Sequence, residues 1–151
     1  MSNALNIRQS TFADNAAINQ LVTEVVVECY GHLLPCYAPD PNADWEHAWV
    51  SEKNGKIIAV LLTAGEWIDD LWIVKAERRS GLGSRLLQIA EQEIAARGNG
   101  QARLRFVAEN AVAFKFYTKN GWQNLRRFPH EKYSFEMVEM SKPLLKNAVS
   151  R

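Results

Sequence analysis

The sequence has few of the features that mark secreted, metal-bound or membrane-spanning proteins. Its two cysteines, Cys29 and Cys36, form no Cys-x-x-Cys pair, which is typical of reduced thiols rather than of a disulfide framework. The histidines and cysteines show no recognised zinc-ligand spacing, so no metal is expected. No apolar run approaches the roughly 20 residues of a membrane span, and the first residues do not form a basic segment followed by an apolar one. We therefore expect a cytoplasmic protein without a membrane partner.

The charge of the chain also lacks a dominant sign. The formal net charge is +1, so no overall electric field favours binding to nucleic acid. A chain of 151 residues can bury a core of its own, and no repeat or linker divides it. We expect one domain over residues 1–151, with a core at about 5–144 and a tail at 145–151, acting as a monomer or a homodimer.

Patterns of apolar residues predict a mixed α/β (α+β) fold. Asn54-Gly55 is typical of a tight hairpin turn, and the proline-rich residues 31–44 predict a long loop. Helices are expected to begin near Asp14, Leu82 and Asn110, and strands to cover residues 5–11, 47–55, 56–65, 67–74, 102–109, 122–128 and 132–142. The central strand–helix–strand unit implies a parallel pair, whereas the hairpins imply antiparallel pairs.

A glycine-rich turn, ERRSGLGSRLL at residues 77–87, precedes the second expected helix. Glycines at 81 and 83 allow the backbone to approach an anion closely, and the helix start offers unpaired N–H groups. Arg78 and Arg79 add positive charge beside them. The pattern indicates a pyrophosphate site, although a plain turn between a strand and a helix is the alternative.

Two common nucleotide motifs do not fit this turn. A P-loop requires Lys followed by Ser or Thr after the last glycine, but Ser84 and Arg85 stand there. A dinucleotide-binding fingerprint requires a small residue at the position of Leu86. Neither a P-loop nucleotide nor a dinucleotide is therefore the favoured ligand.

Two segments together carry a resemblance to one family. RRSGLG (78–83) has the pattern Arg-x-x-Gly-x-Gly, and NAVAFKFYTKNGW (110–122) has the pattern Asn-x-x-Ala-x-x-x-Tyr-x-x-x-Gly-Trp. The chain resembles the GNAT family, the GCN5-related N-acetyltransferases, from about residue 5 to residue 144. The resemblance implies a central mixed sheet of about seven strands flanked by helices, with a splayed parallel strand pair that binds the cofactor.

The resemblance also implies an activity and a set of cofactor-binding residues. Acetyl-CoA would be the co-substrate, and an acceptor amine of a small molecule or peptide would attack the acetyl group directly in a ternary complex. The backbone of the turn would bind the pyrophosphate, and the preceding strand would bind the pantetheine arm. The residues so implied are Leu71, Trp72, Ile73, Arg78, Arg79, Ser80, Gly81, Leu82, Gly83, Ser84, Asn110, Ala113 and Tyr117.

Two residues of the second motif have alternative interpretations. Tyr117 resembles the general acid of the family, because a phenol can protonate a departing thiolate; the alternative is a tyrosine packed on a helix face. Asn110 resembles the asparagine that contacts the pantetheine arm, and N-capping of the following helix is the alternative.

A carboxylate is needed to accept a proton from the acceptor amine. Asp69 is the first candidate, because some aminoglycoside acetyltransferases carry an aspartate at the similar position, and Glu66 is the second; simple ion pairing is the alternative. Arg105 stands where acetyltransferases of ribosomal-protein N-termini have a glutamate base, which argues against their mechanism. Arg105 either favours an acidic acceptor or is a solvated arginine.

A different class of function is open as well. A non-catalytic acyl-CoA-binding regulatory domain would need the glycine turn but neither Tyr117 nor a general base. Aromatic residues in 30–49 and at Trp67 and Trp72 indicate an acceptor site for a small amine, although they could equally be core.

Overall fold

The computed structural model describes residues 5–145 and contains a seven-stranded mixed sheet of order β1-β2-β3-β4-β5-β7-β6. The chain divides into two compact units. The first unit comprises the residues up to 62 together with residues 70–86, and the second comprises residues 63–69 and those from 87 on. The expected α/β fold with about seven strands is confirmed.

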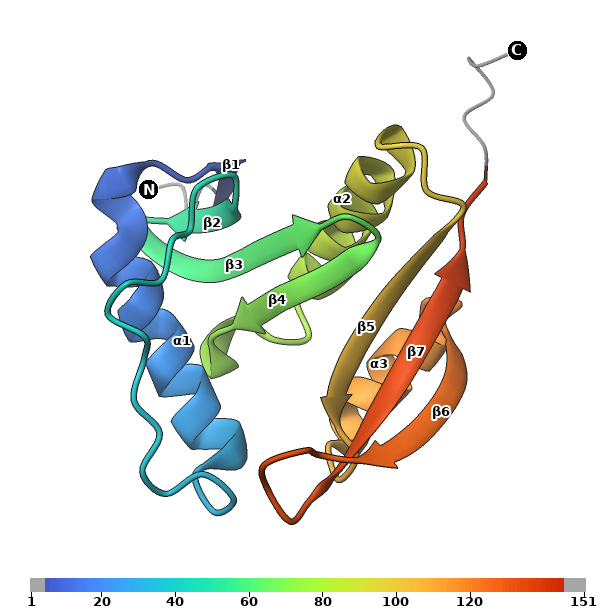
Figure 1. Ribbon diagram of the computed structural model, residues 1–151. Coiled ribbons are helices and arrows are strands. Elements are labelled where there is room, and N and C mark those ends of the chain that lie inside the picture. Colours follow the sequence, from blue (N-terminus) through green and yellow to red (C-terminus); the bar gives the residue numbers. More distant parts are fainter. Residues whose placement is uncertain (1–4, 146–151) are drawn as a thin grey trace. The chain divides into compact units, whose positions relative to one another are not determined.

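The first unit is built on an antiparallel meander (Figure 1). Its strands are β1 (Leu5–Gln9), β2 (Trp49–Lys53) and β3 (Lys56–Ala64), which pair in that order. Asn54 and Gly55 form the turn between β2 and β3 with φ angles of 52° and 76°, the left-handed conformation that a two-residue hairpin requires. The structure confirms the predicted hairpin.

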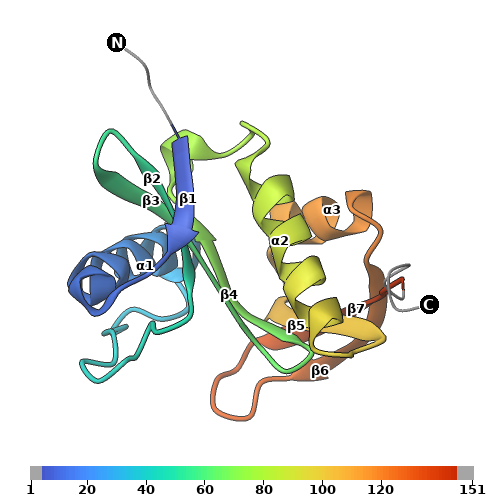
Figure 2. The same ribbon diagram turned by 90° about the horizontal axis from the view of Figure 1, so that it is seen from above.

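Helix α1 (Asn15–Tyr30) covers one face of this meander (Figure 2). A short 3₁₀ turn, η1 (Phe12–Asp14), leads into the helix. The apolar stripe of α1 is buried and consists of Ile18, Leu21, Val22, Val25, Val26 and Tyr30. Burial of β-branched valines against a sheet therefore outweighs their weak intrinsic preference for helix.

Strand β4 (Trp67–Ile73) and helix α2 (Leu82–Ala96) have residues in both units. A second 3₁₀ turn, η2 (Lys75–Glu77), follows β4 and leads to the glycine-rich turn. Gly98 follows the end of α2 with a φ angle of 93°, the left-handed conformation that glycine commonly adopts after a helix. The residues expected to bind pyrophosphate therefore lie in the turn between strand β4 and the start of helix α2.

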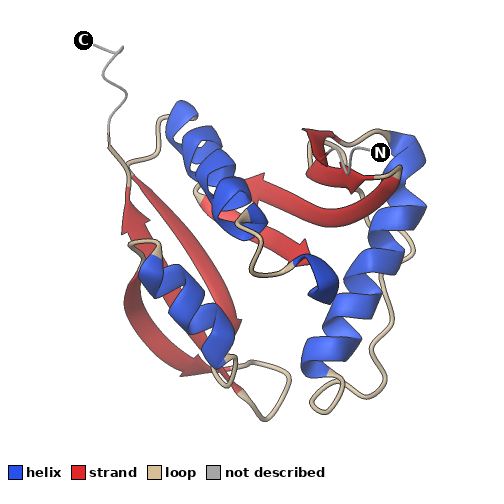
Figure 3. Ribbon diagram, turned by 180° about the vertical axis from the view of Figure 1, so that it is seen from behind, coloured by secondary structure: helices blue, strands red, loops and turns tan. Residues whose placement is uncertain are grey.

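The second unit places helix α3 (Ala111–Lys119) on a face of strands β5 (Gln101–Val107), β6 (Gln123–Pro129) and β7 (Glu136–Pro143), as Figure 3 shows. Strand β7 is antiparallel to both β5 and β6, and β5 is parallel to β4 at Trp67↔Arg103. The predicted parallel pair is confirmed. Ala102, Leu104 and Phe106 of β5 are buried, so its other face carries the arginines.

One expected boundary is wrong. The last strand begins at Glu136 rather than near residue 132. Nδ1 of His130 accepts hydrogen bonds from the backbone N–H groups of Lys132 (2.9 Å) and Tyr133 (3.2 Å), which closes a turn there. Most of the expected tail, residues 146–151, lies outside the described residues. No helix within residues 5–145 is both long enough and apolar enough to cross a membrane.

Candidate functional site

The glycine-rich turn presents backbone N–H groups at the start of α2. Arg79 and Gly81 have φ angles of 64° and 86°, a left-handed conformation that glycine adopts without strain. The first hydrogen bond of the helix runs from the N–H of Arg85 to the carbonyl of Gly81 at 3.1 Å. The N–H groups of residues 82–84 therefore precede the intrahelical bonding pattern, and such groups bind anions.

Arg78 holds this turn in place. Its Nε donates to the carbonyl oxygen of Ile73 at 3.1 Å, and its two terminal nitrogens donate to the carboxylate of Glu28 at 2.7 and 2.6 Å. The Ser80 hydroxyl donates to the carbonyl of Glu77 at 2.6 Å, which closes the turn itself. The guanidinium of the Arg-x-x-Gly-x-Gly motif thus links the end of β4 to α1, within the first unit.

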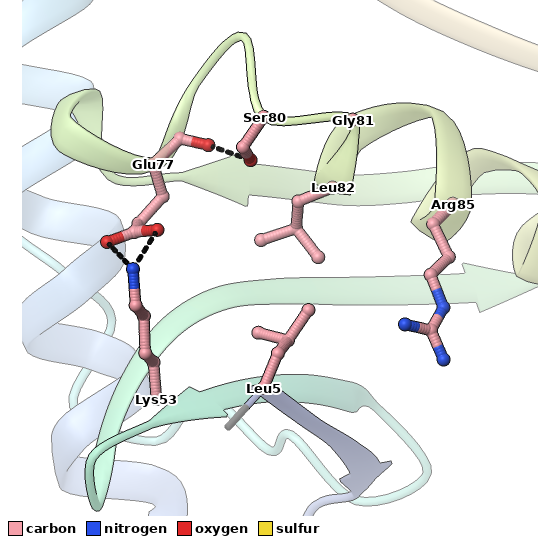
Figure 4. Close-up of a pocket in the computed structure, with 7 residues that line it drawn as sticks. All are labelled: Leu5, Lys53, Glu77, Ser80, Gly81, Leu82 and Arg85. Atoms are coloured by element: carbon pink, nitrogen blue, oxygen red, sulfur yellow. Dashed lines mark hydrogen bonds and ion pairs between the residues drawn. The ribbon is translucent and has the colours of Figure 1, made fainter. Parts of the chain in front are cut away.

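A pocket of about 270 Å³ lies beside the turn. Figure 4 shows its lining: Leu5, Lys53, Glu77, Ser80, Gly81, Leu82 and Arg85. Lys53 Nζ donates to the Glu77 carboxylate at 3.2 Å, whereas the guanidinium of Arg85 has no protein acceptor within residues 5–145. Because Glu77 compensates the charge of Lys53, Arg85 is the cation of this lining that favours an anion at the turn.

Sequence reasoning did not select Lys53 or Arg85. Arg85 directly follows Ser84, so a search for cations near the glycines would have found it. Lys53 is more than 20 residues from the turn and ends β2, so no local signal exists for it. Only the pairing of the strands brings Lys53 to Glu77.

The end of β4 is fixed within the first unit. Leu71, Trp72 and Ile73 are half-buried, and the N–H of Val74 donates to the carbonyl of Ile58 at 3.1 Å. The indole Nε1 of Trp72 donates to Asp70 at 2.9 Å, so these two side chains share a face, as strand parity predicts. The role of this strand in binding a pantetheine arm stays a prediction.

Asn110 caps helix α3. Its side-chain oxygen accepts a hydrogen bond from the backbone N–H of Ala113 at 3.0 Å. The N-cap alternative drawn from the sequence is therefore confirmed, and the spacing Asn-x-x-Ala has a structural reason. A role for Asn110 in cofactor binding stays a prediction.

Tyr117 is held between three aromatic rings. The ring centroids lie 5.7 Å from Phe106, 5.1 Å from Phe116 and 5.9 Å from Trp122. The N–H of Trp122 also donates to the Tyr117 carbonyl at 3.0 Å. This packing fixes the half-buried phenol ring. A general acid requires such a fixed ring, and a purely structural tyrosine has one as well, so both interpretations of Tyr117 agree with the packing.

A second cavity, of about 340 Å³, lies within the second unit and is lined by Trp67, Ile68, Asp69 and Arg105. Partial loss of hydration raises the pKa of the Asp69 carboxyl above its ordinary value. No protein group within residues 5–145 donates a hydrogen bond to that carboxylate. A carboxylate with these properties can accept a proton from a bound amine.

Glu66, the second candidate base, is already occupied. Its carboxylate accepts hydrogen bonds from Nη1 of Arg103 at 3.3 Å and from Nε2 of Gln101 at 3.4 Å. The surroundings of Asp69 therefore suit proton transfer better than those of Glu66.

Arg105 belongs to a cluster around the fully buried Glu139 of β7. Nε of Arg105 donates to Glu139 at 3.0 Å, Nη2 of Arg126 donates at 3.1 Å, and Arg103 also donates to this carboxylate. Burial opposes the charge of Glu139, but the three guanidinium donors outweigh burial and hold its pKa below the ordinary value. Arg105 thus lines the cavity, is bonded to Glu139 and remains partly exposed to solvent.

The predicted site residues are therefore distributed over both units. The first unit brings together the end of β4 and the turn, and the second contains Asn110, Ala113, Tyr117, Asp69 and Glu66. Among residues 5–145, no group of three or more His, Cys, Asp and Glu side chains is arranged to hold a metal ion.

Comparison with known proteins places these features in a family context. Residues 44–124 match the family model described as the acetyltransferase (GNAT) domain. A search of curated protein sequences gave no match.

Many solved structures have the same fold. Ribosomal-protein-S18-alanine N-acetyltransferase from Escherichia coli superposes with a TM-score of 0.70 at 17% identity, covering 96% of this chain and 97% of that chain. Ard1 from Thermoplasma volcanium superposes with a TM-score of 0.73 at 17% identity, covering 95% of this chain and 99% of that chain. The protein yncA from Salmonella typhimurium, solved with its cofactor acetyl-CoA, superposes with a TM-score of 0.73 at 17% identity. The match covers 96% of this chain and 96% of that chain. At such identities the likeness concerns the fold.

Proposed function

Because this chain belongs to the GNAT acetyltransferase family, we propose that it transfers the acetyl group of acetyl-CoA to a primary amine of a small molecule or peptide. The observation that carries the proposal is the cavity of the second unit, where Asp69 presents a carboxylate that no described protein group occupies. A domain that only binds acyl-CoA has no need of such a carboxylate. The proposal includes one domain over residues 1–151, acting in the cytoplasm as a monomer or a homodimer.

The glycine-rich turn is suited to the pyrophosphate of coenzyme A. The N–H groups at 82–84 precede the first helical hydrogen bond, and the left-handed Arg79 and Gly81 shape the turn. The backbone of Arg79, Gly81, Gly83 and Ser84 would bind the anion, with Arg85 as an additional cation. The backbone of residues 71–73 would pair with the pantetheine amides as an added strand does.

Acetyl transfer requires the protein to accept a proton from the acceptor and to donate a proton to the leaving sulfur. Bound acetyl-CoA supplies an activated thioester. Asp69, directly or through water, accepts a proton from the acceptor ammonium, so that the free amine can attack the thioester carbonyl carbon in a ternary complex. The Tyr117 hydroxyl gives its proton to the sulfur as the carbon–sulfur bond breaks. The nitrogen loses a second proton as the amide forms, so that, with Tyr117 reprotonated, the net reaction releases one proton to solvent.

The test combines thiol release with cofactor binding. Wild-type protein is incubated with acetyl-CoA and a panel of amino acids, polyamines, aminoglycosides and peptides, and free thiol is measured. Tyr117→Phe should lower kcat by a factor of about 100 or more while leaving the Kd for CoA nearly unchanged. Tyr133→Phe, a change in the exposed turn of the second unit, is the matched control and should keep wild-type turnover.

The outcomes separate the two classes of function. Tight binding of CoA without turnover on any amine would favour the non-catalytic acyl-CoA-binding domain. Turnover that persists in Tyr117→Phe would remove Tyr117 as the acid and leave the transfer reaction standing.

A further inference from the structure

The cavity of the second unit contains one carboxylate and one guanidinium that do not pair with each other. Within residues 5–145 no ion pair joins Asp69 and Arg105, although both line the same cavity. We propose that this cavity selects acceptors that carry a carboxylate beside the reacting amine, that is, free amino acids or their close analogues. The inference rests on the proposed acetyl transfer and names its substrate class.

Arg105 has hydrogen-bonding capacity left for a ligand. Only its Nε is engaged, by Glu139, and within the described chain the two terminal nitrogens have no protein acceptor. The side chain keeps 45% of its surface exposed. A guanidinium with two free terminal nitrogens forms two parallel hydrogen bonds with a carboxylate.

The orientation of Arg105 is fixed before any ligand arrives. Its guanidinium carbon lies 4.7 Å from the ring centroid of Trp67 and 5.3 Å from that of Phe128. The contacts with these two rings and the bond to Glu139 restrain the planar group. Little side-chain entropy is then lost when a carboxylate binds.

The cluster of arginine and glutamate side chains around Arg105 has a net positive charge. Arg103, Arg105 and Arg126 share the single carboxylate of Glu139, and Arg103 has a second partner in Glu66. Three guanidinium groups thus face two carboxylates, so a positive charge remains on the open face of β5. A ligand carboxylate compensates that charge.

Asp69 supplies the opposite charge in the lining of the cavity. Its carboxylate has no donor among the described residues and can accept a hydrogen bond from an ammonium group. The cavity volume of about 340 Å³ falls at the small end of the range for small-molecule sites, and Trp67 provides an apolar wall. A peptide acetylated at its N-terminus has an amide in place of the neighbouring carboxylate, so the cavity favours a free amino acid over a peptide.

The experiment uses acceptors that differ only in the anionic group. Each amino acid that is acetylated is compared with its amide and with the corresponding decarboxylated amine, for example phenylalanine, phenylalaninamide and phenethylamine. With wild-type protein, kcat/KM should be about 10- to 100-fold higher for the free amino acid, the effect of charged hydrogen bonds.

Arg105→Gln should abolish this preference by raising KM for the amino acid while leaving the amine unaffected. Arg127→Gln is the matched control, because Arg127 pairs with Glu136 outside the Glu139 cluster and does not line the cavity, and it should keep the preference. If either variant fails to fold, the comparison of acceptors with wild-type protein still decides the matter.

Two results would overturn the inference in different ways. Equal kcat/KM for amino acid, amide and amine would overturn the carboxylate requirement while leaving acetyl transfer intact. No acetylation of any amine by a protein that binds CoA would overturn the proposed function and this inference with it.

Discussion

Arg78 of the glycine-rich turn donates two hydrogen bonds, of 2.7 and 2.6 Å, to the carboxylate of Glu28 on α1. The hydrogen bonds from Arg78 lower the pKa of the Glu28 carboxyl. Because Arg78 also donates to the carbonyl of Ile73, its guanidinium ties three segments of the first unit together. The arginine of the motif thus supports the glycine-rich turn through protein contacts, and the backbone N–H groups of the turn are left to bind the ligand.

Loss of this support should weaken cofactor binding. Glu28→Gln removes the charge partner of Arg78, so we expect the Kd for CoA to rise about 3- to 10-fold, as for the loss of one charged hydrogen bond. The free energy of unfolding should change by less than about 1 kcal/mol, because the pair is partly exposed. Calorimetric titration with CoA and urea unfolding measure the two effects.

Glu24→Gln is the matched control for this change. Glu24 lies one turn earlier on α1, where it accepts a hydrogen bond from Gln20 at 3.5 Å. An unchanged Kd in Glu28→Gln, equal to that of Glu24→Gln, would show that the ion pair does not support the turn.

The pH dependence of turnover should report Asp69. Its pKa is raised by loss of hydration, and only the ionised carboxylate can accept a proton. In the wild-type protein, kcat/KM should therefore rise with pH through a pKa above the ordinary aspartate value of about 4. Asp69→Asn should lower kcat/KM about 100-fold and flatten this acidic limb, measured as a pH–rate profile with a fixed amine.

Asp70→Asn provides the comparison. The Asp70 carboxylate accepts a hydrogen bond from Trp72, which an asparagine side chain can also accept, so the acidic limb should persist. If the limb survives in Asp69→Asn and disappears in Glu66→Gln, the base is Glu66 instead.

The stability of the first unit should depend on pH through Asp14. Hydrogen bonds from Arg8 lower the pKa of Asp14 from 3.8 to about 2. A lowered folded-state pKa stabilises the protein above the unfolded value, and the contribution is lost as the pH falls from about 4 towards 2. Asp14→Asn should therefore cost about 2 kcal/mol at pH 7, and the difference from wild type should shrink in acid.

Urea unfolding at a series of pH values measures this effect. Asp40→Asn serves as the control, since Asp40 lies in the exposed loop after α1 and has no ion pair within residues 5–145. A difference between wild type and Asp14→Asn that stays constant from pH 7 to pH 3 would contradict the prediction.

Local patterns in the sequence are sufficient to predict most of the helices, strands and turns. Asn54-Gly55 indicates its hairpin because a left-handed pair of residues defines that turn, and Asn110 indicates a helix start because its side chain caps the third following residue. For the last strand the sequence predicts too early a start, because the alternating residues from Lys132 do not reveal the turn closed by His130.

The sequence by itself therefore determined the glycine-rich turn, the helix cap and the family, because each depends on residues a few positions apart. The tertiary structure alone decided what the arginines do. Arg78 meets Glu28 across 50 positions, and Arg105 faces Glu139 because β5 and β7 pair in one particular register. Such partners are set by which strands and helices pack together, and the burial of Glu139 makes its hydrogen bonds obligatory. That constraint fixes one arginine with its terminal nitrogens open to a ligand.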